Sequence, residues 1–327
     1  MSQKKAVFIA VLFTLALVAM PAVEAVVNIQ NTGAGARAAA MGNSFVAVAD
    51  NSDAIFFNPA GLNQVKKRGV AYTNVSLFFS GIDEDNLGQH VLSFVQPMGE
   101  KMALGLAYER IGSNLMSENG AFFSLSYRLS QKLNLGLNAK YLFWSVDDID
   151  PDPVSGLPDP LSGASAGNVG LDLGVLWKSP IEGAKVGLLL KNVNQPDVSK
   201  GEAKIDTDGD GLGDKVDSDA GKLPMDLHVG LSYPVSETSL VSVQWVMRDL
   251  SGEETEKRLV VGGETKLVEG LLLRAGGAKI FEDDASGDVN AGIGYMWGKT
   301  GFDYSYHIPL DLTETNGSHR FSLAYEF

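Results

Sequence analysis

Cysteine is absent from the 327-residue chain, so the protein can hold neither a disulfide framework nor a lipid-modified amino-terminal cysteine. Basic residues are scarce as well, because 26 lysines and arginines stand against 40 aspartates and glutamates, for a net charge of -14. Proteins that bind nucleic acid need clustered basic residues to neutralise phosphates, so we expect no nucleic-acid partner. Beyond the first 25 residues there is no run of 18 apolar residues, which excludes a transmembrane helix there.

The first residues have the pattern of a secretory signal peptide. Lys4 and Lys5 precede an apolar run over residues 6–20, which is shorter than the roughly 20 residues that a membrane-spanning helix needs. A small-x-small triplet at residues 23–25 offers a cleavage site. We therefore expect residues 1–25 to be a signal peptide; a retained helical anchor is the alternative.

What the chain does contain is alternation of apolar residues with polar or small ones. Val289, Ile293 and Tyr295 fall on one face of an extended strand, whereas Asn290 and Gly292 fall on the other. Similar runs predict fourteen strands, near residues 70–80, 88–96, 102–110, 120–129, 132–146, 167–178, 185–194, 224–234, 239–250, 257–267, 271–281, 288–297, 301–311 and 318–327.

The lengths of these strands and of their links favour a membrane barrel. Most of the runs have the length of about 9 to 11 residues that a tilted strand needs to cross a bilayer, whereas soluble strands centre on about five or six. Short links alternate with longer ones, as periplasmic turns and outer loops do in outer-membrane barrels. The sequence therefore predicts an all-β transmembrane antiparallel β-barrel of about 14 strands. A soluble secreted β-sandwich, which also alternates, is the alternative.

The same pattern predicts how the barrel sits in a membrane. An even number of strands with short turns on one side leaves both termini on the periplasmic side of the outer membrane. Aromatic residues near strand ends fit the girdles at the two bilayer interfaces. We expect Tyr127, Trp177 and Trp297 at the periplasmic rim and Tyr108 and Trp144 at the outer rim, whereas Trp245 lies in mid-strand and does not fit.

Residues 26–68 do not alternate, and small residues dominate them. A short Ala-rich helix in this segment could pack closely inside a barrel, so we expect an N-terminal plug here and the barrel over residues 69–327. A disordered leader is the alternative. Arg37 is the one charged residue in the run of small residues, and we expect it to pair with an inward-facing acid of the barrel wall.

Three stretches of this segment carry a family resemblance: Gly35-Ala36-Arg37-Ala38-Ala39-Ala40-Met41-Gly42, Val46-Ala47-Val48-Ala49-Asp50-Asn51 and Asn58-Pro59-Ala60-Gly61-Leu62. They resemble the amino-terminal signature of the PorV/PorQ family, within the broader FadL-like outer-membrane proteins. The resemblance implies a fourteen-stranded barrel with an amino-terminal plug, and it marks as family-motif residues Arg37, Gly42, Asp50, Asn58, Pro59 and Gly61. The carboxy-terminal run ending in Phe327 resembles the signal read by the barrel-assembly machinery.

One acidic segment, within an insertion at about 201–220, has the spacing of a calcium loop. Carboxylates stand at positions 1, 3 and 5 of a twelve-residue stretch, a glycine at position 6 and further carboxylates at positions 9 and 12. Calcium takes six to eight oxygen ligands, so we expect a structural Ca²⁺ held by Asp206, Asp208, Asp210, the Leu212 carbonyl, Asp214 and Asp217. A solvated acidic loop is the alternative.

Nothing in the sequence predicts an enzyme. Residues 163–167 match the G-x-S-x-G pattern of a nucleophile elbow, but they precede a strand in a loop rich in proline and glycine, where an elbow needs a strand before it and a helix after it. The histidines His90, His228, His307 and His319 show no metal or triad spacing.

FadL-type members of the resembled group carry hydrophobic small molecules across the outer membrane, and PorV-type members serve type IX secretion. The first expectation is therefore passive transport of hydrophobic or small solutes. The second is a secretion-system subunit that docks exported proteins. A secreted β-sandwich that binds a ligand is the third reading, from another class.

Overall fold

The structure, a computed structural model, describes residues 34–76, 87–150, 162–198, 221–250, 252, 255–281, 287–310 and 317–327. The expected signal peptide and the expected calcium loop at 206–217 both lie outside the described residues. No helix in the described part is long and apolar enough to span a membrane.

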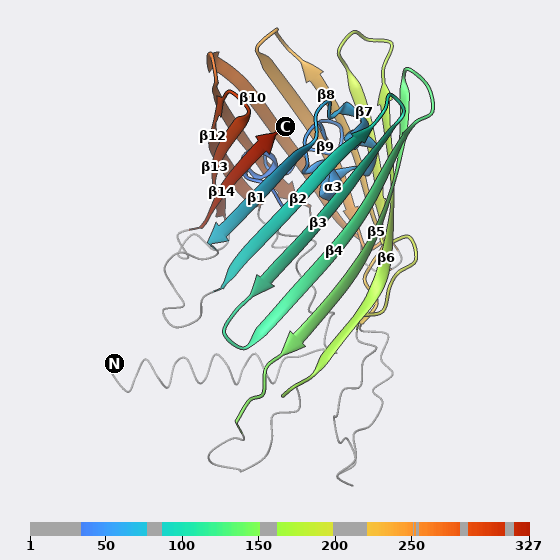
Figure 1. Cartoon of the computed structure of the whole chain (residues 1–327), viewed down its shortest axis with the longest axis vertical. Coiled ribbons are helices and arrows are strands. Elements are labelled where there is room, and N and C mark those ends of the chain that lie inside the picture. The colour runs from blue at the N-terminus through green and yellow to red at the C-terminus, as the bar shows by residue number, and fades with distance from the viewer. Residues whose placement is uncertain are drawn as a thin grey trace, which may run out of the picture.

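Fourteen antiparallel strands close into one barrel, in which the first strand pairs with the last (Figure 1). This closure confirms the fourteen-stranded barrel and rules out the two stacked sheets of a β-sandwich. The strands are β1 (Gly69–Ser76), β2 (Gly88–Met98), β3 (Met102–Gly112), β4 (Met116–Arg128), β5 (Leu133–Val146), β6 (Ser165–Lys178), β7 (Lys185–Lys191), β8 (Asp226–Pro234), β9 (Ser239–Arg248), β10 (Glu256–Val268), β11 (Leu271–Ile280), β12 (Gly287–Trp297), β13 (Thr300–Pro309) and β14 (Ser318–Glu326).

Alternation determines which side chains face outward. Leu92, Phe123 and Tyr295 face outward from β2, β4 and β12 and are about half exposed, at 52%, 50% and 49%. The intervening residues, such as Ser124 and Asn290, face the interior and are buried. Large apolar side chains exposed over a whole wall are rare in soluble proteins. A sheet is stable in the hydrocarbon of a bilayer only when barrel closure pairs the backbone N–H and C=O groups of its edge strands. The outer wall is therefore suited to lipid.

The short turns and the C-terminus lie at one end of the barrel, at the top in Figure 1. The other end, where β1, β3 and β5 finish, is called here the long-loop end. β7 is shorter than the sequence predicts and stops at Lys191 instead of 194. Asn192 has a φ of 53° and its backbone N–H donates to Asp172 Oδ1 at 2.9 Å, so the chain leaves the wall there.

The expected place of one girdle residue, Trp144, is wrong. Tyr127, Trp177 and Tyr108 are exposed on the outer wall near strand ends, and Trp297, at the end of β12, is also exposed. Trp144, however, points into the barrel, and its Nε1 donates to the Val198 carbonyl at 3.0 Å. The reason is phase: the even-numbered residues of β5 face inward, so the position of Trp144 near a strand end does not bring it to the lipid.

Residues 34–68 lie inside the barrel and are called here the plug; they appear in blue in Figure 1. The plug contains α2 (Ala36–Ala40), α3 (Ala54–Phe57) and the 3₁₀ helix η2 (Pro59–Gln64). α2 packs on β11–β14 and η2 packs on β2–β6, so the plug reaches across the lumen. These helices are too short to be stable alone, and their burial against the wall stabilises them.

Candidate functional site: the plugged lumen

Inward-facing glycines let the plug approach the wall. A Cβ added to Gly136 of β5 would lie 2.1 Å from the backbone nitrogen of Ala60, and one added to Gly276 of β11 would lie 2.2 Å from the carbonyl carbon of Met41. Real Cβ atoms do not come this close, so a side chain at either position would displace the plug.

The Asn58–Gly61 motif forms the corner of the plug. Asn58 Nδ2 donates to the carbonyls of Val46 at 2.8 Å and Val175 of β6 at 3.0 Å, and its Oδ1 accepts from Ala60 N at 3.1 Å. Pro59 occupies the first turn of η2, where no backbone N–H is needed. At Gly61 an added Cβ would fall 2.1 Å from the Ala49 carbonyl oxygen. These residues join two plug segments to the wall, which is a structural role.

Arg37 links the plug to the wall through an ionic network. Its Nε and Nη2 donate to the two carboxylate oxygens of Glu264 on β10, at 2.8 and 2.9 Å, and its Nη1 donates to Asp50 at 2.6 Å. Glu264 also accepts from Arg274 Nε at 2.5 Å, and Arg274 Nη1 donates to Asp303 at 2.6 Å. The sequence predicted an inward-facing acid as the partner of Arg37, and in the structure that acid is Glu264.

Burial by itself lowers the pKa of Arg37, but Asp50 and Glu264 outweigh the burial and raise that pKa well above its ordinary value. Arg37 therefore stays charged.

Gly42, the remaining family-motif residue, follows α2 with a φ of 66°, and a Cβ there would meet the Gly277 backbone nitrogen at 2.6 Å.

Asp53 is a plug residue that the sequence did not single out. Its carboxylate is buried and accepts from Asn51 Nδ2 at 3.1 Å. Burial raises the pKa of Asp53 to about 6, and the nearby Asp303 acts in the same direction, whereas Asn51, Arg37 and Arg274 oppose the shift. The available signal was a short polar run, Asp50-Asn51-Ser52-Asp53, between apolar segments of the plug.

Apolar side chains line one side of the lumen, and we call them the apolar track. Phe122 and Leu142 project inward from β4 and β5, and the Phe122 ring lies 4.9 Å from that of Phe56 in the plug. At the long-loop end the same buried cluster includes Val198 and Leu223, from the chain segments beyond β7 and before β8. The track also includes Ile111 and the partly buried Trp144 and Leu87. Apolar contact thus extends from the long-loop mouth to the plug.

The alternation pattern did not predict this track, because alternation assigns polar or small residues to the inner face throughout. A usable signal was present at residues 141–146, where both faces of the strand carry apolar residues. Such a segment is buried on both sides.

The opposite wall of the lumen is charged. Lys191, His228, Arg248 and Arg258, from β7 to β10, line a cavity of about 50 Å³ beside Phe56 and Phe57 of the plug. Acids lie next to these bases: Arg258 is hydrogen-bonded to Asp288, and Arg248 Nη1 lies 3.4 Å from Glu256 Oε1. The lumen is therefore mixed: the apolar track on β3–β5 lies among the buried Glu109, Glu118 and Lys140 of the same strands, whereas ionic side chains dominate β7–β12.

The remaining sequence motifs form no reactive centre among the described residues. Ser165 opens strand β6 and no helix follows it. In the described part of the chain no three His, Asp or Glu residues group as metal ligands do. His228 and His307 face the lumen, and His90 and His319 face outward.

Comparison with known proteins finds the same barrel. No protein-family model and no curated protein matches the chain. Among solved structures, the toluene transporter TbuX of Ralstonia pickettii aligns with a TM-score of 0.65 and 14% identity, over 92% of this chain and 100% of TbuX. The toluene transporter TodX of P. putida aligns at 0.64 and 13%, over 90% and 99%. A FadL homologue of Pseudomonas aeruginosa aligns at 0.55 and 16%, over 92% and 98%.

The TM-scores of 0.55 to 0.65 show a shared fold, whereas identities of 13% to 16% leave the PorV/PorQ resemblance as a prediction. In its fold, the chain is a closed β-barrel of fourteen strands similar to the barrels of FadL-like outer-membrane transporters.

Proposed function

We propose that the protein is a passive, non-enzymatic channel for hydrophobic small solutes in the outer membrane. The apolar track carries the proposal. A pore for hydrophilic solutes is lined by polar groups and water, whereas an apolar solute gains roughly 0.8 kcal/mol for each methylene group that it removes from water. Ile111, Phe122 and Leu142 offer such contacts from the long-loop mouth to the plug.

The similar solved structures support the choice of solute. TbuX and TodX are described as toluene transporters, and by analogy we propose compact, apolar solutes for this chain too. Fold similarity alone does not determine function, so the proposal depends on the track. We further propose that the short turns and both termini face the periplasm, so that solutes enter at the long-loop end.

The plug closes the route in this state. A solute that follows the track reaches Ile55 and Phe56 of the plug, which are packed on the wall. Passage to the short-turn end then requires the plug to shift, and the Arg37–Glu264 link opposes such a shift. We propose that brief loosening of the plug, rather than a permanent pore, limits the rate of transport.

The test is uptake of radiolabelled toluene by cells that produce the protein as an added channel. Leu142→Asn places an amide in the track and is expected to lower uptake about tenfold, because one buried leucine contributes about 1.5 to 3 kcal/mol and 1.4 kcal/mol is a factor of ten. The control is Val260→Asn, the same kind of change at an inward-facing apolar residue of the charged wall.

Equal amounts of folded protein are first verified by heat-dependent gel mobility. If Leu142→Asn and Val260→Asn transport toluene like the unchanged protein, the track does not carry solute and the proposal is wrong. Recovery of secretion machinery by pull-down from cross-linked membranes, without toluene uptake, would favour the secretion subunit instead.

A further inference from the structure

The charges on the outer wall are unevenly distributed. Among the described strands, the outward-facing positions carry no acid, although the chain as a whole has a net charge of -14. Three outward positions carry arginine or lysine: Arg110 on β3, Lys257 on β10 and Lys279 on β11. All three lie in the half of the wall next to the long-loop end. That level of the wall therefore attracts anions from the surrounding lipid.

Arg110 belongs to a row of polar side chains across three strands. Asn74 of β1 pairs with His90 of β2, which pairs with Arg110 of β3. His90 Nδ1 lies 2.8 Å from the Tyr72 hydroxyl and 3.2 Å from Asn74 Nδ2. Because the amide nitrogen can only donate, Nδ1 accepts, and the proton of a neutral imidazole is then on Nε2. His90 and Arg110 are both exposed, and together they offer N–H donors to an anion.

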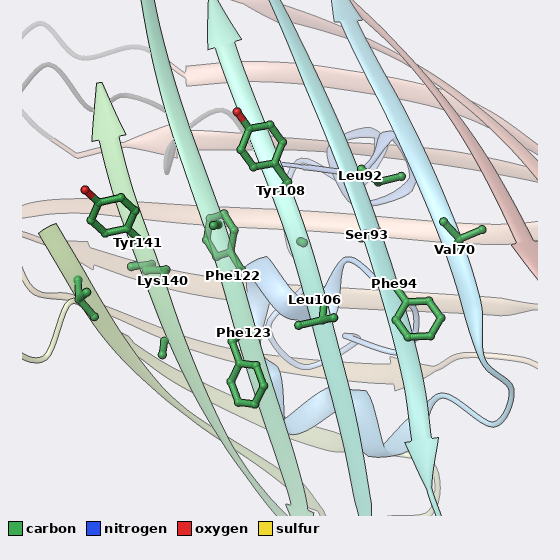
Figure 2. Close-up of a pocket in the computed structure, with 14 residues that line it drawn as sticks. Val70, Leu92, Ser93, Phe94, Leu106, Tyr108, Phe122, Phe123, Lys140 and Tyr141 are labelled. Carbon is green, nitrogen blue, oxygen red and sulfur yellow. The ribbon is translucent and has the colours of Figure 1, made fainter. Parts of the chain in front are cut away.

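A groove of about 610 Å³ lies on the outer wall one row closer to the short turns. Figure 2 shows its lining, with the Tyr108 and Tyr141 hydroxyls directed toward the long-loop end. Small side chains produce the hollow: Ala121 sits between Tyr108 and Tyr141 across three strands, and Ala139 pairs with Phe123. Successive rows are about 7 Å apart along a strand, so the groove begins next to Arg110.

We propose that one anionic lipid of the surrounding leaflet docks here, with its phosphate on Arg110 and His90 and an acyl chain in the groove. Arginine binds phosphate through two parallel hydrogen bonds, and the apolar groove fits a hydrocarbon chain. The groove opens on the lipid-facing wall, so lipid is in contact with it at all times. A basic residue beside an apolar groove complements the negative headgroup and the apolar chain of an anionic phospholipid. This lipid site is independent of the proposed transport.

Native mass spectrometry of the full chain in detergent tests the proposal, with phosphatidylglycerol and phosphatidylcholine of equal chain length as probes. Phosphatidylglycerol is expected to bind more tightly. Arg110→Gln should weaken it about fivefold, since one basic residue near a membrane surface contributes about that factor. Ala121→Leu fills the groove without a change of charge and should weaken both lipids.

The matched control is Lys279→Gln, which removes a basic residue at the same level of the wall but away from the groove. It should leave phosphatidylglycerol binding unchanged. Equal binding of the two lipids, or an equal loss in Lys279→Gln and Arg110→Gln, would overturn the proposal. So would an Ala121→Leu variant that retains lipid but loses toluene uptake, because the groove would then hold solute. Arg110 and Ala121 both lie on the outer wall, whereas Leu142 faces the lumen. Failure of the lipid site therefore leaves the Leu142→Asn test intact.

Discussion

Replacing Arg37 with alanine tests how firmly the plug is held. The guanidinium makes two hydrogen bonds to Glu264 and one to Asp50, and its side chain is only 17% exposed. Removal of one partner of a buried ion pair costs about 3 to 5 kcal/mol. The lower end applies here, because Glu264 keeps Arg274 and the Asp50 side chain is 35% exposed to solvent. We expect a loss of about 3 kcal/mol in plug docking, which is roughly a 100-fold rise in the undocked population.

Hydrogen exchange at the plug amides measures that population directly, because exchange of buried amides requires local opening. The control is Lys67→Ala, which removes an ion pair with Glu326 whose side chains are 58% and 46% exposed; exposed pairs contribute at most about 1 kcal/mol. Faster exchange over residues 34–68 in Arg37→Ala alone would support the reasoning. If the two variants exchange alike, with unchanged permeability, the link to Glu264 does not hold the plug.

Three further outcomes are expected. Asp53 has a pKa of about 6 in the folded protein, above the ordinary value near 4; the stability that its proton confers is present below pH 4 and lost as the pH rises through 6, so plug amides, after correction for the base-catalysed intrinsic exchange rate, should be less protected at pH 7.5 than at pH 5, and Asp53→Asn should remove that difference in protection. Calorimetry on the purified protein should detect calcium binding, and the Asp206→Asn, Asp208→Asn double variant should abolish it; no heat from the unchanged protein would exclude the calcium site. Gly136→Ala should lower the thermal midpoint because its Cβ would meet Ala60, by several degrees for a loss of about 1 to 3 kcal/mol; an unchanged midpoint would mean that the plug shifts freely.

Much of the wall could be predicted from local pattern. Most observed strands begin and end within two or three residues of the predicted ones. The reason is that a strand with one apolar face shows an apolar residue at every second position along its length. The alternating runs also predicted the number of strands, and the rhythm of short and long links favoured a membrane barrel over a soluble sandwich. The calcium loop and the signal peptide stay predictions, since the described residues include neither.

Contacts between distant residues required the tertiary structure. Arg37 meets Glu264 across 227 positions of sequence, and an acid in any of the inward-facing rows could have met the sequence expectation. Trp144 shows the same limit, because its place near a strand end suggested lipid, whereas its phase in the closed wall brought it to Val198. The apolar track exists because β3, β4 and β5 bring Ile111, Phe122 and Leu142 to one side of the lumen. The alternation of the sequence determines which face of the wall each side chain occupies, but only closure of the barrel around the plug determines which inward-facing residues become neighbours.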